Sequence, residues 1–221
     1  AILRGTVSVN DAPAKKPNQM VGDGDVLTLD DPAAGYVSRA ALKLIAGLDA
    51  GSISVEGKIC LDVGSSTGGF TQVLLERGAA RVYAVDVGHD QLHPTIGSNP
   101  AVISLEGTNA RDLDAETIPE PIDLLVSDVS FVSVTKVLNA PLALCAPQAQ
   151  AVILFKPQFE VGRDHVGKGG IVTDTAASEG AMEAVISFVA ARGFALQKRV
   201  TSPIAGGDGN HEFLLGAVKG L

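Results

Sequence analysis

Hydrophobic positions along most of the chain fall into short, nearly continuous apolar runs separated by segments of helical length. These runs are KICLDV at 58–63, RVYAVDV at 81–87, AVISLEG at 101–107, IDLLVSDVS at 122–130, QAVILFKP at 150–157, FALQKRV at 194–200 and HEFLLGAV at 211–218. A longer predicted helix, from about Asp174 to Arg192, precedes the last two. Strands that are apolar on both faces and alternate with helices are typical of a mostly parallel sheet covered on both sides. The pattern therefore predicts an α/β fold.

The first 30 residues follow a different pattern. Two strand-like pieces, TVSVN at 6–10 and DVLTL at 25–29, flank DAPAKKPNQMVGDG, in which proline, asparagine and glycine mark turns. We interpret residues 1–30 as a small β-rich module and residues 31–35 as a linker. Residues 36–221 then form the main domain.

The start of the main domain carries a helix signal. Ser38 is placed to cap a helix that runs to about Leu48, with Leu42, Ile45 and Leu48 on one face. Further upstream, the chain opens on AILRGTVSVN, without a methionine and inside a strand-like pattern. We therefore expect a further segment in front of residue 1, so that the net charge of −8 does not describe the whole protein.

Composition narrows the class of protein. The net charge of −8 provides no global basic field for nucleic acid, although a local basic patch is enough for phosphate contact. Cys60 and Cys145 lie in apolar runs without a CxxC pair, which indicates reduced, buried thiols of a cytoplasmic protein. The histidines show no metal-ligand spacing, so no metal is expected. No apolar run reaches the ~18 residues of a membrane span and no signal peptide is seen, so no membrane partner is expected.

A cluster of small residues interrupts the apolar pattern in LDVGSSTGGFTQVL, at 61–74. Gly64, Gly68 and Gly69 form G-x-x-x-G-G, which fits neither the dinucleotide fingerprint nor the P-loop. A strand, a glycine turn and a helix place backbone N–H groups ready for a ligand. Asp86 ends the next strand, 22 residues after Gly64, where a carboxylate can accept both hydroxyls of a ribose. The alternative is a structural turn with an incidental aspartate.

The pattern that starts at Asp62 resembles the first motif of S-adenosylmethionine-dependent methyltransferases, which implies S-adenosylmethionine as the cofactor. Asn109 and Asp112, after the third strand, can reach the adenine or can form an Asx turn that starts a helix. The expected cofactor-binding residues are Asp62, Gly64, Ser65, Thr67, Gly68, Gly69, Phe70, Asp86, Asn109 and Asp128.

Charged residues follow several predicted strands, at the rim where open α/β sheets bind ligands. Asp128 follows DLLVS, and Lys156 follows AVILF. In a methyltransferase-type sheet the last strand runs antiparallel, so Glu212, at its start, is expected on the same rim. Lys43, on the preceding helix, can pack over this edge. Considered alone, each lysine can instead be a solvated surface residue, and Asp128 can be a cap at the end of a strand.

Longer segments carry a more specific resemblance. SRAALKL, SDVSF, LFKPQFE, KGGIVTD and GNHEFLLG resemble the haemolysin-A (TlyA) family of ribosomal RNA ribose methyltransferases, within the FtsJ-like superfamily. The likeness extends from Tyr36 to Val218. It implies a catalytic tetrad of Lys43, Asp128, Lys156 and Glu212. The chain departs from the family at Ala40-Ala41, where Gly-Gly is usual; this departure affects no catalytic assignment.

The N-terminal module resembles the second half of an S-four type RNA-binding module, whose first, helical half is absent here. A second candidate RNA contact is VGRDHVGKGG at 161–170, which carries Arg163, His165 and Lys168. That segment can bind RNA phosphate or can be an ordinary solvated loop.

The resulting hypothesis is a cytoplasmic ribose 2′-O-methyltransferase that acts on ribosomal RNA or ribosomal subunits. Lys156 is its candidate base if the amine is neutral, and otherwise orients the hydroxyl. A base-amino methyltransferase is an alternative, but such enzymes usually place Pro-Pro-aromatic where this chain has Val129-Ser130-Phe131. A membrane-lytic haemolysin is opposed by the lack of a signal or span, and a non-catalytic RNA-binding relative by the complete tetrad.

Overall fold

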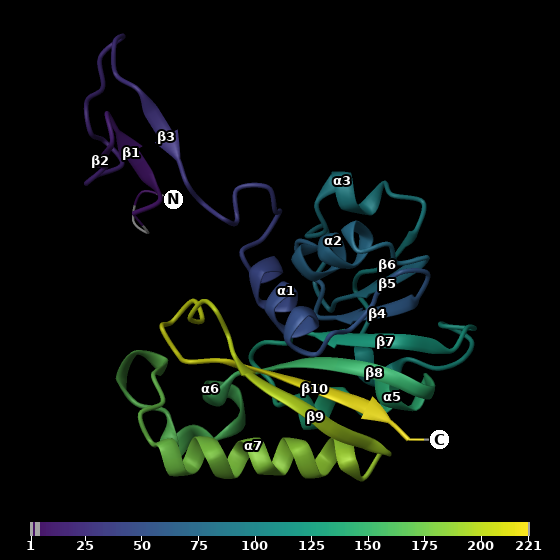
Figure 1. Ribbon diagram of the computed structural model, residues 1–221. Helices are drawn as coiled ribbons and strands as arrows, with labels where there is room; N and C mark the ends of the chain where they lie inside the picture. Colours follow the sequence, from purple (N-terminus) through teal and green to yellow (C-terminus); the bar gives the residue numbers. More distant parts are fainter. Residues whose placement is uncertain (1, 3–4, 221) are drawn as a thin grey trace. The chain divides into compact units, whose positions relative to one another are not determined.

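The computed structural model of the chain describes residue 2 and residues 5–220 (Figure 1). The chain divides into two compact units, with the boundary after Tyr36. Residues 1, 3 and 4 of the expected N-terminal module lie outside the described residues. Among the helices of the described part, none combines the length and the apolar character that crossing a membrane requires.

The N-terminal unit contains a small antiparallel sheet in the order β2-β1-β3. Its strands are β1 (Val7–Val9), β2 (Ala12–Pro13) and β3 (Leu27–Leu29). The strands β1 and β3 lie within the two expected strand segments, whereas β2 lies where only turns were expected. The chain reverses directly after β1 because Asn10 and Asp11 adopt positive φ angles of 50° and 63°, which these residue types tolerate well.

The second unit is built on a seven-stranded sheet in the order β6-β5-β4-β7-β8-β10-β9. Its strands are β4 (Ile59–Val63), β5 (Arg81–Val85), β6 (Val102–Leu105), β7 (Ile122–Ser127), β8 (Cys145–Phe155), β9 (Phe194–Thr201) and β10 (Phe213–Lys219). The neighbouring pairs among β4 to β8 are parallel, and β10 runs antiparallel to both β8 and β9. The predicted α/β fold with an antiparallel last strand is confirmed.

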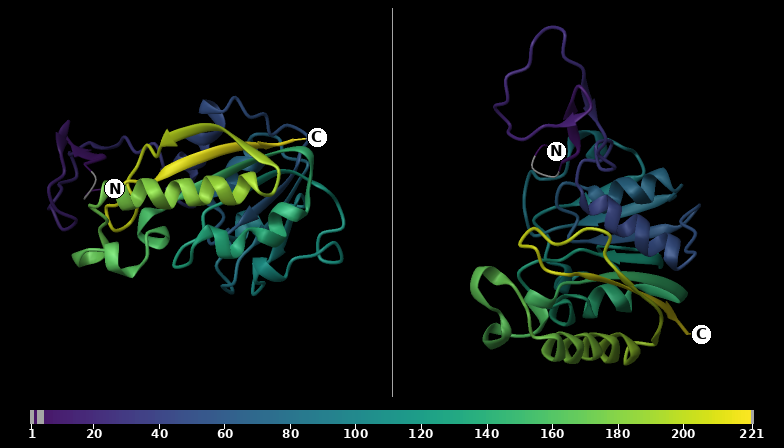
Figure 2. Two further views of the ribbon diagram at one scale, coloured as in Figure 1. Left: turned by 90° about the horizontal axis from the view of Figure 1, so that it is seen from below. Right: turned by 60° about the vertical axis from the view of Figure 1, so that its left-hand side comes forward.

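Helices cover both faces of this sheet: α1 and α2 lie on one face, and α5 and α7 on the other (Figures 1 and 2). The helices are α1 (Ala40–Ala50), α2 (Gly69–Glu76), α3 (Pro94–Gly97), α4 (Val134–Val137), α5 (Asn139–Ala143), α6 (Pro157–Glu160) and α7 (Thr175–Ala190). Short 3₁₀ turns are η2 (Ala110–Asp112), η3 (Arg163–His165) and η4 (Lys168–Gly170). The long predicted helix is α7, which begins where the Asp174 side chain accepts a hydrogen bond from the backbone N–H of Ala177.

Strand residues with alternating orientation fill the two halves of the core. Leu125 and Ile153 belong to a cluster with Leu142 of α5 and Met182 of α7. On the opposite face α1 packs closely on β8 and β10, because a Cβ on Gly47 would lie only 2.9 Å from Cγ1 of Val152. The sheet is thus buried on both sides, as its continuous apolar strands require.

The helix α1 differs from its prediction at its start and in its buried face. Arg39 occupies the N-cap position without a side-chain bond, and Oγ of Ser38 accepts from the N–H of Ala40 at 3.2 Å instead. The buried face contains Leu44 and Leu48 together with Ala41, Lys43 and Gly47, whereas Leu42 and Ile45 are half-buried. Periodicity of large apolar residues missed this face, since a small glycine and a lysine lie on it.

One rim of the sheet gathers the positions that concern function. The parallel strands β4, β5, β7 and β8 end there, at Val63, Val85, Ser127 and Phe155. The antiparallel β10 begins there, because Phe213 pairs with Phe155. Residues that follow the parallel strands and the residue that precedes β10 therefore lie on the same side of the molecule.

Candidate active site

The turn between β4 and α2 packs tightly against its neighbours. Gly64 has a φ of 85°, and a Cβ on it would lie 3.0 Å from the carbonyl oxygen of Asp128. Gly68 has a φ of 96°, and its Cβ would lie 2.9 Å from Cδ1 of Leu92. Both positions combine a left-handed backbone with close packing, so both require glycine. The glycine motif thus lets the turn lie directly against the residues that follow β7.

A cavity of about 610 Å³ opens at the rim beside this turn, a volume typical of small-molecule sites. Its lining residues are Val63, Gly64, Ser66, Val85, Asp86, Val87, Gly88, Gln91, Thr108, Asn109, Ala110, Arg111, Asp128, Val129, Ser130, Phe131, Val132 and Val137. A smaller cavity of about 140 Å³ shares Gly64, Ser66, Asp128 and Ser130 with it. The other residues of the smaller cavity are Ser38, Ala40, Ser65, Thr67, Gly69 and Phe70.

Asp86 lies in the larger cavity with its carboxylate held at both oxygens. Oδ2 accepts a hydrogen bond from the backbone N–H of Ser66, and Oδ1 accepts one from that of Gly88, both at 2.8 Å. A carboxylate oxygen can accept two hydrogen bonds, so each oxygen keeps one for a ligand. The two backbone bonds fix the direction in which this remaining capacity points.

The smaller cavity is rich in hydroxyl groups and contains one that lacks a partner. The side chain of Ser65 is buried, and its Oγ has no hydrogen-bond partner among the described residues. A buried hydroxyl without a partner costs free energy, which a polar ligand group in this cavity would recover.

Two expected cofactor-binding residues line neither cavity. Gly68 serves the packing of the turn, as described above. Asp62 is fully buried beneath the turn, where Oδ2 accepts a hydrogen bond of 2.7 Å from Oγ1 of Thr71 in the first turn of α2. Burial raises the pKa of Asp62 to about 7, and the neighbouring carboxylate of Asp128 adds to this effect. Asp62 therefore lies beneath the turn and lines neither cavity, and its Oδ1 has no hydrogen-bond partner among the described residues.

Asn109 and Asp112, the two candidate adenine contacts, differ in position: only Asn109 lines a cavity. Asn109 lines the larger cavity, but its Oδ1 accepts a hydrogen bond from the N–H of Arg111 at 3.1 Å and caps η2. The Asx-turn alternative is therefore present at Asn109. Asp112 is exposed and is not among the residues that line the cavity.

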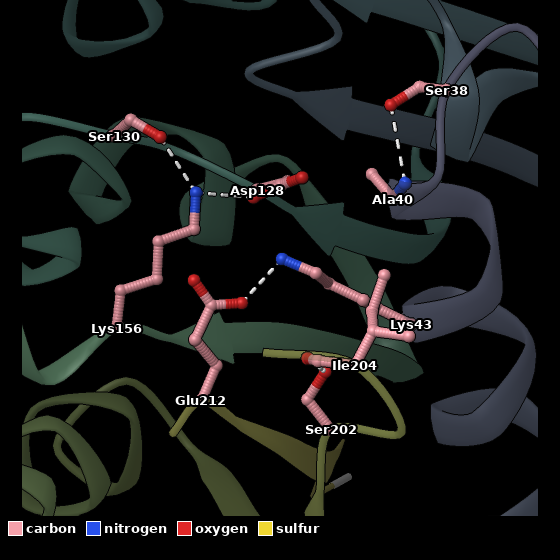
Figure 3. Close-up of polar contacts among 9 residues, drawn as sticks. All are labelled: Ser38, Ala40, Lys43, Asp128, Ser130, Lys156, Ser202, Ile204 and Glu212. Carbon is pink, nitrogen blue, oxygen red and sulfur yellow. Dashed lines mark hydrogen bonds and ion pairs between the residues drawn. The ribbon is translucent and has the colours of Figure 1, made fainter. Parts of the chain in front are cut away.

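The four residues of the predicted tetrad converge at the rim as two ion pairs (Figure 3). Lys43 of α1 pairs with Glu212, directly before β10. Lys156, directly after β8, has its Nζ 2.6 Å from Oδ1 of Asp128, and it also donates to Oγ of Ser130 at 2.7 Å. Asp128 and Ser130 line both cavities, whereas Lys43, Lys156 and Glu212 line neither, so Lys156 is joined to the shared wall through its two partners.

These charges are removed from water to different degrees. The side chains of Lys43, Lys156 and Glu212 are 10%, 9% and 2% exposed, and that of Asp128 is 17% exposed. Burying a charge is costly unless an opposite charge compensates it, and here each lysine has a carboxylate partner. The free-energy cost of removing four charged groups from water, at a rim otherwise built from apolar strands, indicates a functional cluster.

Phe131 is an aromatic side chain at this site that pattern reasoning missed. It is 91% exposed, lines the larger cavity and has a φ of 66°. A positive φ is strained for a bulky residue. Its ring centroid lies 5.3 Å from that of Phe159, which follows β8. Phe131 is the last residue of the SDVSF motif, and this motif was the signal that could have pointed to it.

A second contact joins the loops that carry Asp128 and Lys156. Glu160 accepts hydrogen bonds from Oγ of Ser133 at 2.6 Å and from the N–H of Val134 at 2.9 Å. Burial raises the pKa of Glu160, and the two hydrogen bonds oppose this rise. Together with the Lys156–Ser130 bond, this contact ties the two loops to each other.

The arrangement of the sheet and the rim defines the class of protein. A parallel sheet closed by one antiparallel last strand, with a ligand cavity between the glycine turn after β4 and the acidic residue after β5, is that of an S-adenosylmethionine-dependent methyltransferase. The family profile of FtsJ-like methyltransferases matches residues 36–219. The chain belongs to this family and, within it, to the TlyA or haemolysin-A branch.

Individual relatives agree along nearly the whole chain. The 16S/23S rRNA (cytidine-2′-O)-methyltransferase TlyA of Mycobacterium tuberculosis is 44% identical over 212 residues, which cover 96% of this chain and 79% of that protein. Hemolysin A of Brachyspira hyodysenteriae is 42% identical over 214 residues, which cover 96% and 89%. The solved structure of a putative hemolysin from Streptococcus thermophilus has a TM-score of 0.85 and 38% identity, and covers 99% of this chain and 80% of that one. The expected family is confirmed.

The cofactor of this family, S-adenosylmethionine, fits the residues present. Asp86 keeps acceptor capacity for two hydroxyl groups of a ribose. Ser65 has a buried, unpartnered hydroxyl in the smaller cavity that a polar group of a ligand could engage. The apolar side chains of Val87, Val129 and Val132 give the larger cavity the walls that a flat base requires. Within the described residues, no group of three or more His, Cys, Asp or Glu side chains could hold a metal ion.

Proposed function

We propose that this protein methylates the ribose 2′-oxygen of a cytidine in ribosomal RNA, and that Lys43, Asp128, Lys156 and Glu212 carry out the reaction. The observation that carries the proposal is the ion pair of the buried Lys156 with Asp128, a residue that lines both cavities. The relative from Mycobacterium tuberculosis named above, a 16S/23S rRNA (cytidine-2′-O)-methyltransferase, supports the choice of nucleotide.

The bound cofactor supplies an electrophilic methyl group on a sulfonium. The protein has to place an RNA hydroxyl in line with this group and remove its proton. Placement alone can supply a large part of the rate, because aligned reactants behave like reactants at very high concentration. The two ion pairs provide the means for placement, since they hold four polar groups at the rim.

Lys156 is the group that we assign to the proton of the 2′-hydroxyl. An amine can accept a proton only when it is neutral, and lysine normally has a pKa of ~10.4. Its ammonium donates a hydrogen bond to Ser130 and forms an ion pair with Asp128, which leaves donor capacity for the substrate oxygen. Loss of a proton from Lys156 would leave its lone pair directed at the same place.

Phe131 is suited to hold the target nucleotide. A flat aromatic ring, almost completely exposed beside the reacting groups, offers a stacking surface to an unpaired base. Its contact with Phe159 limits the positions that the ring can take. We therefore assign Phe131 to the base whose ribose is methylated.

Contacts with the remainder of the RNA belong to surfaces outside the cavities. The N-terminal unit, which resembles part of an S-four type module, and the exposed Arg163 and Lys168 are the candidate contacts. Intact ribosomal subunits are the proposed substrate, and the proposed location is the cytoplasm, where these subunits are assembled.

The test is transfer of labelled methyl groups from S-adenosylmethionine to ribosomal RNA or subunits, followed by mass spectrometry of the nucleosides. The expected product is 2′-O-methylcytidine. Asp128→Ala, with unchanged folding by circular dichroism, is expected to form almost none. Methyl groups found on a base nitrogen would refute the ribose assignment, and full activity of Asp128→Ala would refute the tetrad.

A further inference from the structure

One buried amide holds together two loops beside the tetrad. The first, residues 202–212, joins β9 to β10 and is called the hairpin loop; the second, residues 161–173, is called the basic loop. Asn210 of the hairpin loop is 2% exposed. Its Nδ2 donates to the carbonyl oxygen of Gly170 at 2.8 Å, and its Oδ1 accepts from the N–H of Val172 at 2.9 Å. The two loops lie side by side (Figures 1 and 2).

The same hairpin loop forms the wall behind the Glu212 carboxylate. A Cβ on Gly206 would lie 2.5 Å from Oε1 of Glu212, so only a residue without a side chain allows the carboxylate its position. The N–H of Gly206 donates to the carbonyl oxygen of Asn210 at 3.0 Å. The backbone of Asn210 therefore holds Gly206, while its side chain holds the basic loop.

The carboxylate of a glutamate needs neighbouring atoms to restrict it to one position. Its long side chain has many rotamers, and a single ion pair with Lys43 does not define its direction. In Figure 3 the Glu212 carboxylate lies between the two lysines, with one oxygen bound to Lys43. A small sideways movement would break this pairing and leave a buried charge uncompensated.

We propose that Asn210 is a positioning residue for methyl transfer, which acts by keeping Gly206 against the Glu212 carboxylate. The inference rests on the proposed role of Glu212 in the tetrad. Asn210 itself does not touch the reacting atoms. Its two side-chain bonds anchor the hairpin loop to the basic loop, and the anchored loop fixes Glu212 against Lys43.

The principal test is Asn210→Asp, which keeps the shape of the side chain. It replaces the donor Nδ2 with an oxygen that cannot bind the carbonyl oxygen of Gly170. The single-turnover rate of methyl transfer is expected to fall about 10- to 100-fold, as for a misplaced reacting group. Affinity for S-adenosylmethionine, measured by calorimetry, is expected to stay within about twofold, because Asn210 lines neither cavity.

Asn139→Asp is the matched control. Asn139 begins α5, which leads into the opposite end of β8, and its Oδ1 accepts hydrogen bonds from Nε and Nη2 of Arg192. Aspartate keeps that acceptor, so the same chemical change is expected to leave the rate unaltered. A fall in both variants would show a general effect of added charge and would overturn the inference.

A double-mutant cycle separates positioning from general destabilisation. If Asn210 acts through Glu212, Asn210→Asp lowers the residual rate of Glu212→Gln no further. The inference would be overturned if the two substitutions reduced the rate by independent factors that multiply in the double variant. An unchanged rate in the Asn210→Asp single variant would also overturn it. Gly206→Ala offers a second route to the same carboxylate and carries the test if Asn210→Asp does not fold. An unchanged rate in Glu212→Gln would instead refute the tetrad proposal itself.

Discussion

Lys43 and Glu212 form a buried ion pair although 169 positions separate them in the chain. Lys43 lies on α1, ahead of the first strand of the large sheet, and Glu212 lies just before its last. The pair therefore joins the two ends of the main unit. It also makes each partner dependent on the other, because a buried charge is tolerated only when it is compensated.

We predict that Lys43→Met lowers the free energy of unfolding by about 3–5 kcal/mol, since it leaves the Glu212 carboxylate buried without a cation. The double variant Lys43→Met with Glu212→Gln is expected to be more stable than Lys43→Met alone. Urea unfolding of the three proteins measures both effects. A single variant as stable as the original protein would show that the pair contributes nothing.

Replacing Lys156 tests proton transfer at the active site. Lys156→Ala is expected to reduce methyl transfer by about 10²–10⁴-fold with little change in cofactor affinity. Lys156→Arg keeps the positive charge but cannot lose a proton at working pH, so we expect a similar loss. Single-turnover rates, with cofactor binding measured in parallel, check both variants. If arginine retained most of the activity, Lys156 would orient the hydroxyl instead of accepting its proton.

Asp86→Asn is predicted to weaken S-adenosylmethionine binding by about 1–3 kcal/mol, because hydrogen bonds to a charged acceptor are the stronger ones. The amide keeps the shape of the side chain, although one of its two bonds to the Ser66 and Gly88 N–H groups is lost. Asp123→Asn, at the opposite end of β7, is the control. Equal calorimetric affinities for both variants would remove Asp86 from the site.

Phe131 allows stability and activity to be separated. Phe131→Gly removes a bulky residue from a positive φ, so the free energy of unfolding is expected to rise by about 1 kcal/mol. The same change removes the proposed stacking surface, and kcat/KM for RNA is expected to fall about 10-fold or more. Phe131→Tyr keeps the ring and should keep the activity. Unfolding and steady-state assays of both variants decide, and full activity in the glycine variant would contradict the assignment.

The raised pKa of the buried Asp62 carboxyl leads us to predict that the stability of the protein depends on pH. Its pKa is raised from 3.8 to about 7 by burial, so the folded protein binds a proton that the unfolded chain releases. Its contribution to stability is therefore complete below pH ~4 and is lost as the pH rises towards 7. Asp62→Asn should make the fall in stability over this range shallower, by up to about 1.4 kcal/mol per pH unit. Asp112→Asn, at an exposed position, is the control, and equal slopes in urea unfolding would contradict the prediction.

The parts of the fold that sequence could predict are those with a local signature. Apolar runs identified the strands of the large sheet, and the positions of Asp128 and Lys156 after such runs placed them on one rim. The roles of these residues stay predictions, but their convergence follows from the order of strands and the reversal of β10.

Other features depend on packing that no local pattern contains. The prediction of which face of α1 is buried was wrong, because Gly47 and Lys43 lie on the buried face, where large apolar residues were expected. Asp62 has the spacing of a cofactor contact but lies beneath the turn. The wall that Gly206 forms behind Glu212 arises only when both loops are folded, so a glycine in a loop gave no sign of it.

The distance along the chain between Lys43 and Glu212 also has a consequence in time. During synthesis the ribosome makes Lys43 first and adds Glu212 only 169 residues later, on the order of ten seconds at ordinary elongation rates. Until β10 has been made and inserted between β8 and β9, the nascent chain holds only part of the tetrad. The proposed tetrad is therefore complete only after the strand that follows Glu212 has been synthesised and has taken its place in the sheet.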